Sequence, residues 1–251
     1  MIPKRIFQTW KTKNLPRGIQ INIKRIMELN IGYTHILYDD KEMDAFVNEH
    51  YSGEIADAYN ILNIGASKAD LWRYLVLYKY GGIYLDIDAD IIKPLDQLID
   101  RNDSAIITRE QYEGLFNQWI LIFKKNHPLL KEIINLCVSN IKSKSTNNIL
   151  HLTGSTVITT VLNKLLTNES LVGDLWHTPD NILNNIFNDD EEFYKCRFYG
   201  IDMNEYALYH NKFYEELYTE DSPQWEIEQK IKPIFKNTIK NIGELIDKVV
   251  L

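Results

Sequence analysis

Hydrophobic and polar residues follow two different periods along the chain, and the changes of period mark strands and helices. Residues 2–10 and 33–38 are short, largely apolar runs that predict strands. Between them, Ile19, Ile23 and Ile26 recur at the spacing of one helix face. Strands that alternate with helices in this way predict an α/β fold.

The same pattern extends over most of the chain. Asp40 stands where it can cap a helix whose inner face carries Met43, Phe46 and Val47. A polar linker is expected at residues 142–148. Further strands are predicted at 105–108 and 118–123, and further helices at 55–62, 128–137, 154–165 and 239–249.

The clearest predicted helix spans residues 67–80. Ser67 and Asp70 have the spacing of a capping box at its start. Gly81 stands just past its end, where glycine commonly terminates a helix. Four side chains form one buried stripe along it: Leu71, Tyr74, Leu75 and Tyr78.

Directly after this helix, residues 83–91 alternate strictly between apolar and polar side chains. Asp86, Asp88 and Asp90 occupy alternate positions, so in a strand all three carboxylates lie on one face. Same-face neighbours on a strand are only about 7 Å apart. Three anions that close repel one another, and a divalent cation is the simplest compensation because it prefers hard oxygen ligands. These carboxylates also fall at the carboxyl end of the strand, where open α/β sheets place their ligands.

The carboxylate run has other interpretations. A solvated edge strand would also alternate, but the glycine pair before the run and the sequence Ile-Ile-Lys-Pro after it indicate a buried strand that stops abruptly. A calcium-binding EF-hand loop also begins with alternating Asp. It fails here, since Ile91 replaces the glycine at the sixth loop position and Gln97 replaces the glutamate at the twelfth.

A phosphatase of the haloacid-dehalogenase type is the enzymatic alternative. It requires an apolar strand followed by Asp-x-Asp, in which Asp86 would attack phosphorus and Asp88 would act as general acid. Asp189 and Asp190 would supply a later acidic pair. Asp90 departs from that motif, which has Thr or Val there. A non-catalytic carbohydrate- or calcium-binding module is the third possibility.

Three residues outside the carboxylate run are further candidates for a functional site because of their positions. Asp70 and Arg73 lie three apart on the helix, where a surface ion pair is the simpler interpretation. Beside the glycine turn and the carboxylates, we instead expect the pair to face the same cleft as Asp88. Trp10 ends the first strand, at a sheet edge where a nucleotide base can stack.

Composition narrows the classes of function. The 251 residues suffice for one large α/β domain, and 45% hydrophobic with 25% charged residues is ordinary for a soluble protein. A net charge of −7 without a basic run argues against nucleic-acid binding. Two distant cysteines, no signal-peptide pattern and no apolar stretch near 18 residues lead us to expect a cytoplasmic protein without a membrane span.

Three segments resemble glycosyltransferase family 32, the DXD-containing sugar transferases. Residues 2–10 (IPKRIFQTW) are similar to the family's opening strand, with Phe7 where His is common. Residues 66–74 (ASKADLWRY) and 80–88 (YGGIYLDID) are similar to its central signature. The family includes capsular polysaccharide enzymes and initiating α-1,6-mannosyltransferases, with the clostridial glucosylating toxins as distant relatives.

The resemblance implies a single α/β domain of the GT-A type over residues 1–251, with a Rossmann-like nucleotide-binding sheet flanked by helices. Residues 1–130 would bind the nucleotide sugar, and residues 131–251 would form the acceptor side and a C-terminal closing segment. The implied activity is metal-dependent transfer of a hexose or N-acetylhexosamine, with retention, to a saccharide or other hydroxyl acceptor. A UDP-sugar is the favoured donor, and GDP-mannose is possible.

The resemblance also implies roles for individual residues. Asp86, Asp88 and Arg73 would be catalytic, and Asp88, Asp86 and His210 would hold Mn²⁺ or Mg²⁺. In relatives, a C-terminal His is followed by a Ser-Trp pair, whereas here Pro223 and Gln224 separate the corresponding residues. The donor would be bound by Trp10, Asp70, Arg73, Tyr84, Asp86, Asn117, Ser222 and Trp225.

Overall fold

The computed structural model describes residues 1–110, 114–166, 183, 196–199, 206–209, 213–219 and 223–236. Up to the end of the sixth strand, the elements in chain order are β1 (Arg5–Thr9), α1 (Arg17–Leu29), β2 (Thr34–Tyr38), α2 (Asp40–His50), α3 (Glu54–Ile61), α4 (Gly65–Tyr80), β3 (Gly82–Leu85), β4 (Ala89–Ile91), α5 (Leu95–Leu98), β5 (Ala105–Thr108) and β6 (Ile120–Phe123). They are followed by α6 (Pro128–Ser143), α7 (Ile149–Leu152), α8 (Ser155–Leu166), β7 (Cys196–Tyr199), β8 (Ala207–Tyr209), α10 (Tyr214–Leu217) and α11 (Trp225–Ile231). The predicted helix at 239–249 lies outside the described residues.

A six-stranded mixed sheet in the order β2-β1-β3-β6-β5-β7 forms the centre of the fold. β1 pairs parallel with both β2 and β3, whereas β6 runs antiparallel to β3 and β5. The chain passes from β1 to β2 on one side and to β3 on the other, so the strand order reverses between β1 and β3. Open α/β sheets bind ligands at such a reversal, outside the carboxyl ends of the strands.

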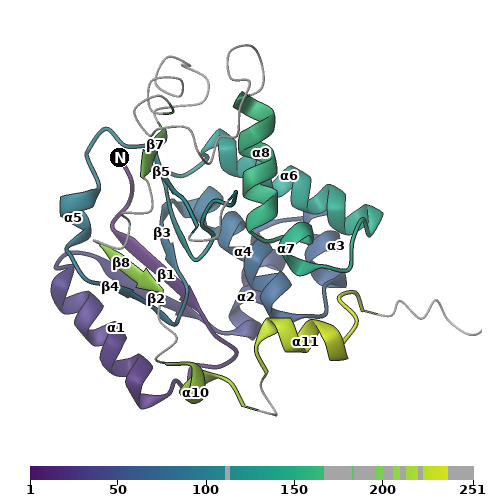
Figure 1. Cartoon of the computed structure of the whole chain (residues 1–251), viewed down its shortest axis with the longest axis horizontal. Coiled ribbons are helices and arrows are strands. Elements are labelled where there is room, and N and C mark those ends of the chain that lie inside the picture. Colours follow the sequence, from purple (N-terminus) through teal and green to yellow (C-terminus); the bar gives the residue numbers. More distant parts are fainter. Residues whose placement is uncertain are drawn as a thin grey trace, which may run out of the picture.

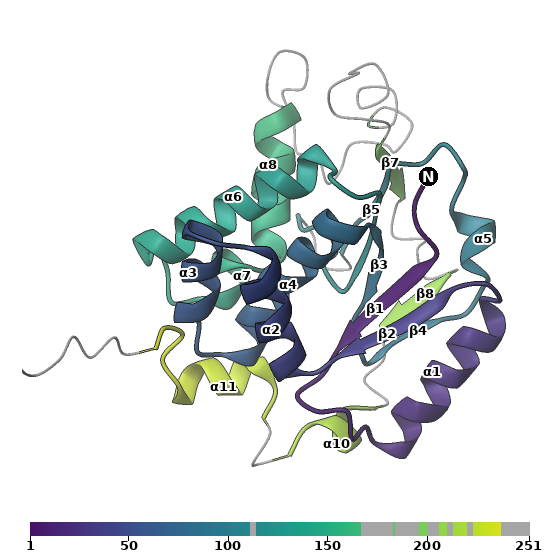
Figure 2. The same ribbon diagram turned by 180° about the vertical axis from the view of Figure 1, so that it is seen from behind.

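Alternate residues of the strands are buried against different helices. Ile6 and Ile83 pack with Ile26 of α1 and with α5, whereas Phe7 and Tyr84 pack with α2, α4 and α6. Figures 1 and 2 show α1 and α5 on one side of the sheet and α2, α4 and α6 on the other. The predicted α/β arrangement, with helices on both faces of the sheet, is therefore confirmed.

Helix α4 crosses the middle of the molecule. All residues from Asp70 to Leu77 are buried, so the helix is enclosed on every side, whereas the sequence predicted a single buried stripe. The predicted start is wrong by two residues: the helix begins at Gly65, and the Ser67 hydroxyl donates to the Ile64 carbonyl 2.8 Å away, as a residue inside the helix does. Asp70 is consequently free to serve another function than capping.

The start of α2 corrects a second prediction. Asp39, not Asp40, is the N-cap, because its carboxylate accepts from the Glu42 amide at 2.9 Å while the Glu42 side chain accepts from the Asp39 amide. This reciprocal capping box leaves Asp40 as the first helical residue.

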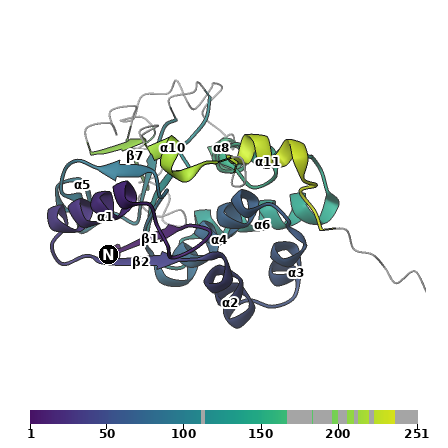
Figure 3. The same cartoon turned by 90° about the horizontal axis from the view of Figure 1, so that it is seen from below.

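The C-terminal elements lie at the carboxyl ends of β1 and β2. Figures 1 and 3 show α10 near α1 and α11 beyond α10, farther from α1. Glu216 of α10 accepts from the Gly18 amide at 3.0 Å, and the Lys236 amide donates to the Ile61 carbonyl at 2.7 Å. Within the described ranges, no helix is both long and apolar enough to cross a bilayer.

Gly81 allows α4 to turn directly into β3, and it confirms the predicted helix end. Its φ of 64° and ψ of 174° belong to a region that side chains strongly disfavour. A Cβ at this position would also lie 2.5 Å from the Lys125 amide nitrogen. Gly53 has a similar φ of 58° but open space around it, so it is a matched control for the backbone contribution.

We therefore expect Gly81→Ala to lower the free energy of unfolding by about 2 kcal/mol more than Gly53→Ala, since only Gly81 adds a steric clash. Urea denaturation of the two variants measures this difference. Equal losses would show that Gly81 is required for its dihedral angles alone.

Candidate active site

A cavity of about 1040 Å³ opens at the reversal point between β1 and β3. Its walls come from the ends of β1 and β3, the start of α2, the first half of α4, the loop before β6 and the segment around α11. Asp70 and Arg73 line it together with Asp86 and Asp88, so the prediction that the helix pair faces the same cleft as Asp88 is confirmed.

Arg73 is the centre of the polar network on the cavity floor. Its guanidinium lies 3.1 Å from the Asp70 carboxylate and 3.4 Å from the Asp86 carboxylate, and it donates to the Gln118 carbonyl at 3.0 Å. It also lies 4.4 Å from the centroid of the Tyr84 ring. Burial opposes its charge, yet the surrounding Tyr84, Asp86 and Asp70 more than compensate and raise the pKa of Arg73. The guanidinium is thus a fixed positive charge in the floor.

Asp70 is almost completely buried behind Arg73. Its second carboxylate oxygen accepts from the Thr153 hydroxyl at 2.9 Å. Burial raises the pKa of Asp70 to about 6, while the charge of Arg73 and the Thr153 hydrogen bond oppose that shift. Asp70 therefore holds Arg73 and ties α4 to the residue that follows α7.

Asp86 directly follows β3 and is held on several sides. Its carboxylate accepts from the Tyr84 hydroxyl at 2.6 Å as well as facing Arg73. Its backbone amide donates to the Trp119 carbonyl at 2.8 Å, and its carbonyl accepts from the Gln8 side chain at 3.0 Å. Burial raises the pKa of Asp86, and Arg73 and Tyr84 act against this rise.

The prediction that three carboxylates share one strand face is wrong. β3 ends at Leu85, and residues 86–88 form a turn closed by a 3.1 Å hydrogen bond from the Ala89 amide to the Asp86 carbonyl. Asp86 and Asp88 line the cavity. Asp90 instead lies on β4, in the separate two-stranded sheet with β8, and forms an ion pair with Arg25 of α1.

Contacts with helix α1 account for the turn of the chain away from the cavity after Asp88. The Asn22 side chain donates to the Ala89 carbonyl at 3.0 Å, and Arg25 donates to the Ile91 carbonyl at 3.2 Å. These polar contacts hold β4 against α1 and away from the cavity. Asp90 consequently has a structural partner, and only two of the three carboxylates remain for chemistry in the cavity.

The donor set of the cavity fits a divalent cation that is shared with a substrate. Across the described ranges, no group of three or more His, Cys, Asp and Glu side chains converges as a metal site. Asp88 and Asp86 nevertheless place two carboxylates in the cavity wall, and magnesium-type sites often combine one or two carboxylates with substrate phosphates. Asp86 also faces Arg73 and Tyr84, and direct ligation of the metal by Asp88 stays a prediction. His210, the third predicted ligand, lies outside the described residues.

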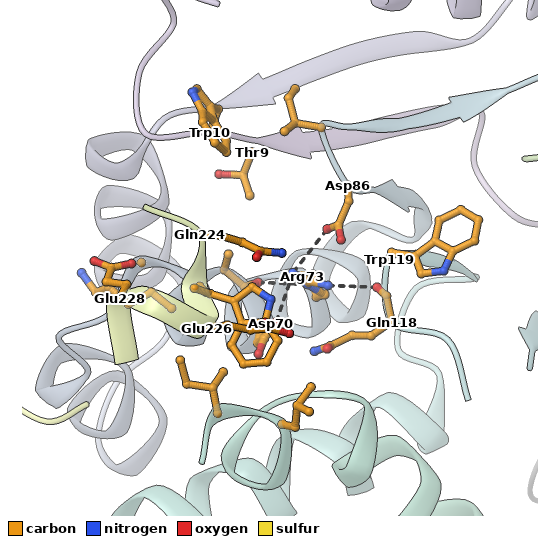
Figure 4. Close-up of a pocket in the computed structure, with 18 of the residues that line it drawn as sticks. Thr9, Trp10, Asp70, Arg73, Asp86, Gln118, Trp119, Gln224, Glu226 and Glu228 are labelled. Atoms are coloured by element: carbon orange, nitrogen blue, oxygen red, sulfur yellow. Dashed lines mark hydrogen bonds and ion pairs between the residues drawn. The ribbon is translucent and has the colours of Figure 1, made fainter. Parts of the chain in front are cut away.

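Trp10 lines the cavity beyond the end of β1, as predicted. Its amide donates to the Tyr38 carbonyl at 3.1 Å, and its ring packs edge-on against Tyr218 with centroids 5.8 Å apart. Figure 4 shows Trp10 and Asp86 at separate points of the cavity wall, with Arg73 in the floor between them and α11. Stacking of a base on Trp10 stays a prediction.

Asn117 contributes an unusual buried acceptor. Its side-chain amide donates to the Thr108 hydroxyl and to the Arg109 carbonyl, both at 2.8 Å. Its carbonyl oxygen is buried and has no hydrogen-bond partner among the residues that the structure describes. Because Asn117 also lines the cavity, this oxygen is compatible with the predicted donor-binding role.

The C-terminal segment closes one side of the cavity. Trp225 lines it together with Gln224, Glu226 and Glu228 of the same segment, several of which appear in Figure 4. The segment is anchored by the Asn63 amide, which donates to the Ile234 carbonyl at 2.7 Å. Ser222 lies outside the described residues, so its predicted role stays a prediction.

Several site residues were not predicted from the sequence. Gln118 donates to the Tyr74 hydroxyl at 2.7 Å and to the Thr153 carbonyl at 3.0 Å, which completes the floor. The contacts of Gln118 and Thr153 join positions far apart in sequence, and no local pattern reports such contacts.

Comparison with known proteins supports this view of the cavity. A family described as "Glycosyltransferase sugar-binding region containing DXD motif" matches residues 16–105. This range contains Asp70, Arg73, Asp86 and Asp88, the carboxylates and the arginine of the cavity floor. The resemblance to DXD sugar transferases is thereby confirmed for this part of the chain.

Individual relatives point in the same direction. The chain is 32% identical over 160 residues to an initiation-specific alpha-1,6-mannosyltransferase of Candida albicans, with 53% of this chain and 41% of that protein covered. It is 35% identical over 133 residues to inositol phosphoceramide mannosyltransferase 3 of Schizosaccharomyces pombe, with coverages of 53% and 36%. The chain thus spans less than half the length of these two relatives.

A solved structure supports the fold. The PaToxG glycosyltransferase superimposes with a TM-score of 0.53 at 23% identity, over 66% of this chain and 70% of that chain. At this level of identity the similarity concerns the fold alone. It confirms the predicted α/β fold of the GT-A type.

The contact between Thr153 and Asp70 can be tested by stability. A hydroxyl has one proton, and the 2.9 Å contact with Asp70 is much shorter than the 3.5 Å contact with the Ile149 carbonyl. We expect Thr153→Val to lower the free energy of unfolding by about 2 kcal/mol, since it removes a buried hydrogen bond to a charged group.

Thr160→Val is the matched control for this prediction. Thr160 lies exposed on α8, where its hydroxyl bonds only to the backbone of its own helix. Its replacement should change stability by less than about 0.5 kcal/mol, as surface substitutions usually do. Urea denaturation that gives the same loss for both variants would contradict the assigned role of Thr153.

Proposed function

We propose that this chain transfers a hexosyl group from a nucleoside diphosphate sugar to a hydroxyl group of a saccharide or other acceptor, with retention at the anomeric carbon. One observation carries the proposal: Asp86 pairs with the Arg73 guanidinium in a cavity at the reversal point of the sheet, and Asp88 lines the same cavity. Relatives named as mannosyltransferases favour mannose as the sugar.

The residues of the floor support specific tasks. Asp88, assisted by Asp86, would hold Mn²⁺ or Mg²⁺ against the diphosphate. Such a cation would neutralise the negative charge that develops on the leaving diphosphate. Arg73 is a fixed cation that orients Asp86 and adds positive potential beside that site. Arg73 and Asp88 are buried, and a less polar surrounding strengthens such electrostatic contacts.

Retention by attack on the same face is the course that the family resemblance implies, and it agrees with how two nearby carboxylates are held. A double displacement requires a carboxylate that is able to attack the anomeric carbon. Asp70 is held by Arg73 and Thr153, and Asp90 is ion-paired to Arg25 outside the cavity. We therefore propose that the acceptor hydroxyl attacks while the diphosphate departs.

The geometry favours a transferase over the phosphatase alternative. A phosphatase would use Asp86 as an exposed nucleophile, yet Asp86 accepts from Tyr84 and faces Arg73. The match to a DXD sugar-binding region covers the same residues. Cytoplasmic location and the division of the chain at residue 130 stay predictions.

Asp88 and Asp90 provide a matched pair for testing the site. They are two residues apart, chemically identical and both buried, but only Asp88 lines the cavity. We expect Asp88→Asn to abolish Mn²⁺-dependent hydrolysis of the nucleotide sugar, because it removes the proposed metal ligand. Asp90→Asn should keep turnover within about threefold of the unmodified protein and mainly lower stability, since it uncouples the ion pair with Arg25.

The measurement is release of nucleoside diphosphate from a panel of UDP- and GDP-sugars, with and without Mn²⁺, with circular dichroism to verify folding. Full activity of folded Asp88→Asn would reject the metal assignment. Turnover of simple phosphate esters instead of nucleotide sugars would favour the phosphatase, and binding without turnover would favour a non-catalytic module.

A further inference from the structure

If the chain has the proposed function, the order of the strands at the cavity edge indicates which base the donor nucleotide carries. β2, β1 and β3 are neighbours, and adjacent strands lie about 4.8 Å apart. Asp40 comes two residues after β2, Trp10 directly follows β1, and Asp86 directly follows β3. Along this edge, Asp40 and the proposed diphosphate site therefore lie on opposite sides of Trp10.

This order matches the shape of a nucleotide. The ribose links the base to the phosphates, and the hydrogen-bonding edge of the base points away from the ribose. With the diphosphate at Asp86 and Asp88 and the base on Trp10, that edge faces the start of α2. Asp40, Met43 and Asp44 of α2 all line the cavity there.

The two acids of α2 differ in their surroundings. Asp44 accepts from the Tyr59 hydroxyl at 2.9 Å and pairs with Lys68 at 2.5 Å, so it already has partners. The Asp40 carboxylate makes no hydrogen bond or ion pair within the described part of the chain, although the charges of Lys68 and Lys11 act on it at longer range. Lys11 also lies 5.4 Å from the centroid of the Trp10 ring. Asp40 is thus the carboxylate near Trp10 that is available to a ligand.

A carboxylate distinguishes the bases by their donor patterns. Guanine presents two adjacent donors, N1–H and the N2 amino group, which match the two oxygens of one carboxylate. Uracil presents a single N–H between two carbonyl oxygens, and these oxygens repel an anion. Adenine and cytosine each place an amino donor beside a ring nitrogen that carries no hydrogen. Only the amino group can donate to the carboxylate, so only one of the two contacts is favourable.

We propose that Asp40 recognises guanine stacked on Trp10, so that the donor is a GDP-sugar. This proposal revises the UDP-sugar favoured by the family resemblance. It assigns Asp40, which the sequence suggested only as a helix cap, to donor specificity.

The test is calorimetric binding of GDP, UDP and inosine diphosphate to the full chain in the presence of Mn²⁺. The unmodified protein should bind GDP at least about tenfold more tightly than UDP, the factor that corresponds to 1.4 kcal/mol. Inosine diphosphate lacks the N2 amino group and should bind with intermediate affinity. Asp40→Asn should reduce the preference for GDP over UDP by about tenfold, since it replaces one of the two accepting oxygens by an amino group that donates.

Two further variants separate base recognition from other effects. Asp44→Asn should leave the ratio of GDP to UDP affinity unchanged, because Asp44 is occupied by Tyr59 and Lys68. Trp10→Ala should weaken both nucleotides together, because stacking is insensitive to the donor pattern of the base. The Asp40 side chain is exposed, so its substitution is compatible with folding.

Equal affinity for GDP and UDP in the unmodified protein would overturn the role of Asp40 while leaving a nucleotide-sugar transferase in place. An unchanged ratio in Asp40→Asn, or a lost preference in Asp44→Asn, would also overturn it. Failure of every nucleotide to bind would instead reject the proposed function together with this inference.

Discussion

The buried charge of Arg73 is the constraint on which the rest of the site depends. A guanidinium removed from water is tolerated only with paired charges and satisfied donors. Its partners come from three parts of the chain: Asp70 of α4, Asp86 after β3, and the Gln118 carbonyl before β6. Satisfying this one side chain therefore fixes the relative positions of a helix and two strand ends.

The turn at residues 86–88 follows from the same arrangement. Asp86 is held by Arg73 and Tyr84, and its carbonyl is held by Gln8, so the chain is anchored where it leaves the sheet. Helix α1 then binds the carbonyls of β4 and pairs with Asp90. Contacts with α4 and with α1 therefore separate three carboxylates that are evenly spaced in the sequence. Asp86 and Asp88 line the cavity, whereas Asp90 lies outside it and has a structural role.

The sequence predicted well whatever depends on local periodicity. The strands that end at Thr9 and Tyr38, the helix that ends at Tyr80 and the carboxylates after β3 all follow from short-range patterns. The capping residues were misassigned because neighbouring polar residues compete for the same position, and Asp39 forms the reciprocal contact with Glu42 that Asp40 does not. Local signals of this kind leave an uncertainty of one or two residues at a helix end.

Contacts between distant residues could not be predicted in this way. The side chain of Thr153 reaches Asp70 across 83 positions, and Gln118 reaches Tyr74 across 44. The period-two pattern at residues 83–91 indicated a continuous strand, but it contains no information about α1, which draws β4 away. The errors at this site therefore come from tertiary contacts that override a correct local signal.

The proposed mechanism requires that Asp88 and a diphosphate share one cation beside the Arg73 network. Anomalous diffraction at the manganese edge, from crystals grown with Mn²⁺ and a nucleoside diphosphate, measures this directly. The account predicts a manganese peak bonded to the Asp88 carboxylate and to diphosphate oxygens, at about 2.2 Å. A nucleotide bound without metal near Asp88, or a manganese ion located at Asp90, would contradict it.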